Sequence, residues 1–199
     1  MKRFLPLSIL FALLTLGASA QITLEFNSTT AGTIGAQLDD VAAGTATFGG
    51  LIMSATAFAD GEGEAFNATS SSFGVNDGPT GDTTAEFDQN EGFTFSFSQD
   101  VTLDSLTVSS FGGDSSGSLD FDGGANITSI AATGLTSLSD TTVSSGTLLR
   151  FTSTGISAFS LSNIVVTSAV PEPSSFAALA GLAMLGFVGS RRRRAVSTA

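Results

Sequence analysis

The feature that most constrains the fold of this chain is a strict alternation of Phe with Thr or Ser over residues 93–98. Successive side chains of a β-strand point to opposite faces, so Phe93, Phe95 and Phe97 share one face and three hydroxyl groups share the other. An aromatic row of this kind is typical of a strand with one face in a hydrophobic core. We therefore expect a half-buried strand here.

The surrounding sequence predicts further short strands between turn signals. Candidate strands cover residues 22–26, 45–57, 119–121, 148–152 and 159–167, and turns are expected at 76–79, 111–114 and 122–124. Val101 and Leu103 have one parity and Leu106 and Val108 the other, which predicts a β-bulge or bend between them. Residues 127–138 are ambiguous, because their apolar spacing is helix-like while Gly134 and the many hydroxyl residues disfavour a helix.

These patterns predict an all-β central domain, a β-sandwich or jelly roll, over residues 21–169. Ser and Thr make up 46 of its 149 residues. Such a composition also suits a disordered, low-complexity stalk. Thirteen Phe residues in the same segment, several in strict alternation, favour a packed core.

The charge distribution limits the chemistry of the domain. The chain has 18 acidic and 7 basic residues, and it contains no Cys, His, Trp or Tyr. Between residues 21 and 169, 17 acidic residues accompany a single basic one, Arg150. Disulfides, thiol nucleophiles and His-dependent triads are thereby excluded. An acidic domain is also a poor partner for nucleic acid, whose recognition needs Lys and Arg.

The N-terminus has the three parts of a secretory signal peptide. Lys2 and Arg3 are followed by an apolar stretch over residues 4–16 and by the small residues Ala18, Ser19 and Ala20. We expect a signal helix over residues 1–20, cleavage after Ala20, and a mature chain that begins at Gln21. The alternative is a short membrane anchor or a buried helix.

The C-terminal segment, residues 170–199, predicts a second targeting signal. Pro171, Glu172 and Pro173 precede an apolar run over residues 176–189, and Arg191, Arg192, Arg193 and Arg194 follow it. We expect a transmembrane helix over about residues 174–190, short for a hydrocarbon core of ~30 Å. The arginines would stay in the cytoplasm by the positive-inside rule.

This arrangement resembles the PEP-CTERM sorting signal of exported bacterial proteins. The resemblance covers about 30 residues and implies entry through the Sec machinery, a transient stay in the inner membrane, and processing by exosortase near residues 171–173. It also implies a Gram-negative-type envelope and a host that makes exopolysaccharide. The alternative is a permanent C-terminal anchor with the Pro-Glu-Pro segment as a stiff linker.

Catalysis in residues 21–169 would have to depend on carboxylates or on a metal ion. No spacing singles out an acid and a base, and the large Trp and Tyr faces that favour sugar subsites are missing. We therefore expect no enzymatic activity. The leading hypothesis is an exported surface or extracellular-matrix protein associated with exopolysaccharide or biofilm. The alternatives are a carbohydrate- or Ca²⁺-binding jelly-roll module and a carboxylate-based glycosidase.

Calcium is the one cofactor that the sequence suggests. Asp120 and Asp122 are two residues apart before a glycine turn, and Asp60, Glu62 and Glu64 are spaced in the same way. Hard carboxylate oxygens on loops suit Ca²⁺. The alternative for each cluster is a solvated acidic surface that keeps the exported protein soluble.

Overall fold

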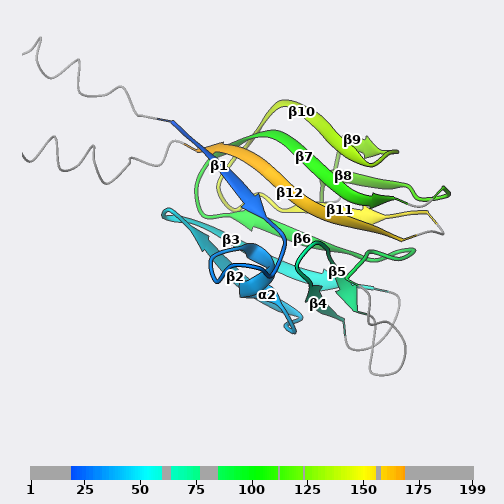
Figure 1. Cartoon of the computed structure of the whole chain (residues 1–199). Coiled ribbons are helices and arrows are strands. Elements are labelled where there is room, and N and C mark those ends of the chain that lie inside the picture. The colour runs from blue at the N-terminus through cyan, green and yellow to red at the C-terminus, as the bar shows by residue number, and fades with distance from the viewer. Residues whose placement is uncertain are drawn as a thin grey trace, which may run out of the picture. The chain divides into compact units, whose positions relative to one another are not determined.

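The alternating Phe residues lie in β6 (Gly92–Phe97), where the three rings are buried and Thr94 and Ser96 are half-buried on the opposite face. The prediction of a half-buried strand is therefore confirmed. The structure is a computed structural model that describes residues 19–59, 64–76, 85–111, 113–122, 124–155 and 158–168 (Figure 1).

Most strands belong to two antiparallel sheets (Figure 1). The six-stranded sheet has the order β2-β3-β6-β11-β8-β9. Its other strands are β2 (Ala43–Phe48), β3 (Leu51–Phe58), β11 (Leu149–Ser153), β8 (Gly117–Phe121) and β9 (Asn126–Ile130). The four-stranded sheet has the order β1-β12-β7-β10. Its strands are β1 (Ala20–Glu25), β12 (Phe159–Ser168), β7 (Val101–Phe111) and β10 (Gly134–Val143).

The hydrophobic core lies between the two sheets. Aromatic rings meet across it: Phe26, just after β1, lies 5.9 Å from Phe93 of β6, and Phe159 of β12 lies 5.6 Å from Phe151 of β11, measured between ring centroids. Residues Gln21–Ser168 pack as one unit around this core. The fold is therefore an all-β sandwich, as the sequence predicts.

A small hairpin and a one-turn helix, which the sequence patterns did not predict, complete the sandwich. Strands β4 (Ala65–Ala68) and β5 (Phe73–Asn76) pair with each other and direct Phe66 and Phe73 toward Phe93. Helix α2 (Ile34–Leu38) buries Ile34 and Leu38. Both elements add their apolar side chains to the common core.

One strand prediction needs correction, and one ambiguous segment is now assigned. Residues 45–57 are not one strand, because the chain reverses at Gly49 and Gly50, which have φ angles of 53° and 95°, and β2 pairs with β3. Residues 127–138 contain no helix, because β9 ends at Ile130 and β10 begins at Gly134. The helix-like spacing arose because it combines apolar residues at the end of β9 with apolar residues of β10, which belong to two different strands.

The predicted bulge in β7 is confirmed. Val166 and Val165 of β12 pair with Leu103 and Ser105, so Asp104 is skipped in the register. The extra residue lets Leu103 and Leu106 both face the core. The Asp104 carboxylate accepts hydrogen bonds from Thr167 Oγ1 at 2.9 Å and Gln21 Nε2 at 3.1 Å, which link the bulge to β12 and β1.

The two predicted targeting helices, over residues 1–20 and about 174–190, lie almost wholly outside the described residues, which include only the last two positions of the first. Within the described part of the chain, no helix has the length and apolar character needed to cross a membrane.

Candidate functional site

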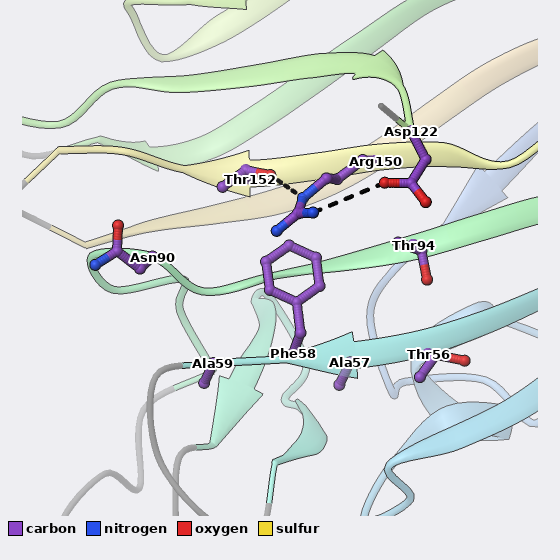
Figure 2. Close-up of a pocket in the computed structure, with 9 residues that line it drawn as sticks. All are labelled: Thr56, Ala57, Phe58, Ala59, Asn90, Thr94, Asp122, Arg150 and Thr152. Carbon is purple, nitrogen blue, oxygen red and sulfur yellow. Dashed lines mark hydrogen bonds and ion pairs between the residues drawn. The ribbon is translucent and has the colours of Figure 1, made fainter. Parts of the chain in front are cut away.

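The outer face of the six-stranded sheet carries a hollow of about 570 Å³. It is formed over β3, β6 and β11, beside the turn that follows β8 (Figure 2). The residues that line it are Thr56, Ala57, Phe58, Ala59, Asn90, Thr94, Asp122, Arg150 and Thr152. Most of them are polar, and Arg150 is the single basic residue between residues 21 and 169.

Strand register brings the central side chains of the hollow together. Arg150 of β11 is paired with Thr94 of β6, which is paired in turn with Thr56 of β3. Leu149 and Phe151 on either side of Arg150 are fully buried, so the alternation of β11 turns Arg150 to the outer face. The same alternation in β3 places Thr56 and Phe58 outward while Ala55 and Ala57 face the core.

The Arg150 guanidinium is held by three contacts (Figure 2). Its Cζ atom lies 4.2 Å from the centroid of the Phe58 ring, Nε donates a hydrogen bond to Thr152 Oγ1 at 3.2 Å, and Nη1 lies 3.7 Å from Asp122 Oδ1. The side chains of Arg150 and Asp122 are 42% and 33% exposed, so their ion pair contributes at most about 1 kcal/mol to stability. Its main effect is to fix the orientation of the guanidinium.

Gly92 gives the Phe58 ring its place in the hollow. The two residues are direct cross-strand partners in β3 and β6. A methyl group built on Gly92 would lie 2.8 Å from the edge of the Phe58 ring and would overlap the carbonyl oxygen of Phe151. Because Gly92 has no side chain, the ring lies down over the sheet and supports Arg150 from below, as aromatic residues do beside glycine in designed sheets.

The structure gives the predicted calcium ligands Asp120 and Asp122 a different partner. Asp120 is the cross-strand neighbour of Arg150 and accepts a hydrogen bond from Ser118 Oγ at 3.2 Å, while Asp122 forms the ion pair with Arg150. Asp122 is therefore paired with an arginine of the chain itself. Sequence spacing could not reveal this, because Arg150 is 28 residues from Asp122 along the chain.

The second predicted calcium cluster is only partly described. Glu64 lies half-buried just before β4, whereas Asp60 and Glu62 lie outside the described residues. Among the residues that the structure does describe, no three acidic side chains are grouped so that they could hold a metal ion. Calcium binding stays a prediction for both clusters.

Sequence reasoning missed Phe58 and Arg150 as members of a site, although two signals point to them. Phe58 is out of phase with the inward-facing residues Met53, Ala55 and Ala57, so it had to lie on the outer face. Arg150 is out of phase with Leu149 and Phe151 in the same way and is the lone cation of an acidic domain. An aromatic ring and a cation on one polar face are a recognisable combination.

Comparison with known protein families bears on the C-terminal segment. Residues 169–194 match the family model of the PEP-CTERM protein-sorting motif. The chain carries a PEP-CTERM sorting motif. It is therefore an exosortase substrate that passes through a membrane stage during export, and the resemblance seen in the sequence is confirmed. Comparison with the curated proteins found no match.

The PEP-CTERM match includes Pro171, Glu172, Pro173 and the four arginines at 191–194, which all lie outside the described residues. Of the predicted signal-peptidase site, Ala18 also lies outside, and Ala20 is the first residue of β1. The individual roles of these residues in cleavage and retention stay predictions. The match begins after the last strand of the sandwich, so the sandwich is interpreted from its own geometry.

Proposed function

We propose that this chain is a non-enzymatic protein of the cell surface or extracellular matrix that associates with exopolysaccharide after exosortase processing. The observation that carries the proposal is the sorting motif at residues 169–194, which directs the sandwich out of the cell. The sandwich is then the part of the chain that acts outside. Its function must come from its surface, because its interior is a packed apolar core.

The surface of the sandwich supports an association with hydrated polysaccharide. Residues 21–169 contain no His, Lys or Cys, the side chains most used for nucleophilic and acid–base catalysis. The outer face of the six-stranded sheet instead offers hydroxyl groups in register, among them Ser54 opposite Ser96 and Thr56 opposite Thr94. Hydroxyl groups both donate and accept hydrogen bonds, as the hydroxyls of a glycan do.

Mass spectrometry of both termini tests the sorting step. Protein from cells and from medium should begin at Gln21 and should have lost Arg191–Arg194. Pro171→Ala combined with Pro173→Ala should leave the chain full-length in the membrane fraction. Pro79→Ala removes a proline outside the motif and serves as the matched control, with unchanged processing. Exported chains that still end at Ala199 would contradict exosortase processing.

Fractionation of the producing cells tests the association with exopolysaccharide. The processed protein should sediment with the matrix of cells that make exopolysaccharide and should appear in the medium of an isogenic strain that makes none. Equal distribution in both strains would overturn the proposed role and would leave the sorting result untouched.

A further inference from the structure

We propose that the hollow beside Arg150 is a binding site for one neutral sugar unit of a polysaccharide. This inference rests on the proposed function and assigns it to one surface. The hollow of about 570 Å³ lies within the range of small-ligand sites and is open along the outer face of the six-stranded sheet, so a chain could enter and leave it.

The polar groups of the hollow match a pair of neighbouring sugar hydroxyls. The Asp122 carboxylate only accepts hydrogen bonds and the Arg150 guanidinium only donates them, and the two lie 3.7 Å apart. This separation exceeds that of a direct hydrogen bond, so both groups keep capacity for a ligand. One hydroxyl of a vicinal diol can donate to Asp122 while the next accepts from Arg150, with Thr94 and Thr56 nearby on the floor.

Arg150 is oriented before any ligand arrives. The Phe58 ring lies under the guanidinium, and Thr152 accepts the Nε hydrogen bond at 3.2 Å. A side chain already fixed in this way loses less conformational entropy on binding, which raises affinity. Because the guanidinium covers that face of the ring (Figure 2), the sugar is held by hydrogen bonds to its edge rather than by stacking on Phe58.

Charge decides which class of sugar fits. The opposite charges of Arg150 and Asp122 cancel within the hollow, and the domain around it carries 17 acidic residues. The field of such a domain repels a uronate or sulfated chain, whereas a neutral chain meets no opposing charge. The site therefore selects neutral sugar units, and acidic polysaccharides are excluded from it at low salt.

A glycan array tests the inference on the processed, exported protein. Neutral gluco-, galacto- and manno-oligosaccharides should include at least one binder, and uronic-acid oligosaccharides of equal length should bind less. Arg150→Ala should weaken binding by about tenfold or more, because it removes charge-assisted hydrogen bonds. Asp122→Asn should weaken it about threefold or more, because an amide accepts less strongly than a carboxylate. Asp140→Asn makes the same change on β10 of the other sheet and should have no effect.

Titration of the ¹⁵N-labelled wild-type protein with the best array ligand gives a test that needs no variant. Amide shifts should change at Thr56, Thr94 and Thr152 and stay constant along β10. The inference is overturned if no neutral oligosaccharide binds, if the shifts change elsewhere, or if folded Arg150→Ala binds as wild type does. If Arg150→Ala still associates with the matrix, the assignment to this site is overturned and the proposed function stands. If the protein binds the sugar but does not associate with the matrix, the proposed function is overturned and the site stands.

Discussion

At the residue scale, phenylalanine supplies most of the largest buried side chains of the core. Nine Phe side chains are fully buried in the part of the chain that the structure describes, and Phe93 lies at their centre, 5.4 Å from Phe151 and 5.8 Å from Phe87 between ring centroids. Phe has no polar atom, so the rings pack from both sheets without any demand for buried hydrogen bonds. A chain without Trp or Tyr can therefore still build a large aromatic core.

Phe93→Ala should destabilise the sandwich by about 3–5 kcal/mol, because the cavity would lie among several rings that cannot all move into it. Urea denaturation of the processed protein measures this loss. Leu135→Ala is the matched control, because Leu135 is 73% exposed and its truncation should change stability by less than about 0.5 kcal/mol. Equal effects of the two substitutions would contradict the central position of Phe93.

Alternation predicted the rings of β6 correctly because a buried aromatic row leaves a pattern within six consecutive residues. The hollow leaves no such pattern. Arg150, Phe58 and Asp122 come from three separate segments, and only the register of β3, β6, β11 and β8 brings them together. Long-range register depends on the whole sandwich, so local patterns could identify each of these residues as outward-facing but could not assemble them into a site.

At the element scale, the apolar pattern of the sequence did not reveal the turn between β2 and β3. Gly49 and Gly50 stand between Phe48 and Leu51, so the apolar character continues through the turn. Asp, Asn and Pro, the other common turn residues, are absent from this stretch. The φ angles of 53° and 95° are positive at both positions, as a two-residue hairpin turn of type I′ requires.

Gly50→Ala should destabilise the protein by about 1–2 kcal/mol, because an L-residue is strained at a φ of 95°. Thermal unfolding followed by circular dichroism measures the change. Gly49→Asn is the control: Asn adopts left-handed angles near 53° readily, so stability should fall by only a few tenths of a kcal/mol. A harmless Gly50→Ala would show that the turn relaxes to another type.

The bulge of β7 was predicted from the sequence, whereas the β2–β3 hairpin was not. Val101, Leu103, Leu106 and Val108 are all buried, and a regular strand cannot bury both parities on one face. The sequence therefore required an extra residue between Leu103 and Leu106. By contrast, β4 and β5 are only four residues each and show no alternation long enough to distinguish them from the surrounding loops.

At the scale of the whole molecule, the basic residues lie mostly near the two ends of the chain and the acidic residues lie in the sandwich. Six of the seven basic residues lie in the two predicted targeting segments, and Arg150 alone lies in the sandwich. The predicted removal of those segments on export would turn a chain of formal net charge −11 into a far more acidic domain. The placement of Arg150 beside Asp120 and Asp122 relieves repulsion at one point of that surface, and the other carboxylates depend on solvent and counterions.

The processed sandwich should therefore gain stability with ionic strength. Raising NaCl from about 10 mM to about 0.5 M shortens the Debye length from about 30 Å to below 10 Å and screens the repulsion between carboxylates, so Tm should rise. Differential scanning calorimetry measures this. A Tm that stays constant or falls would contradict the view that repulsion between carboxylates strongly destabilises the folded domain.

Divalent ions then separate screening from a specific site. At matched ionic strength, diffuse binding predicts that Ca²⁺ and Mg²⁺ raise Tm equally, because both are attracted only by net charge. A further increase with Ca²⁺ alone would indicate a site, since a ligand at 100 times its Kd stabilises the folded state by about 2.7 kcal/mol. Glu62→Gln should abolish that increase if residues 60–64 bind the ion, and Asp140→Asn should preserve it. An increase that survives Glu62→Gln but is lost in Asp122→Asn would instead assign calcium to the turn beside Arg150.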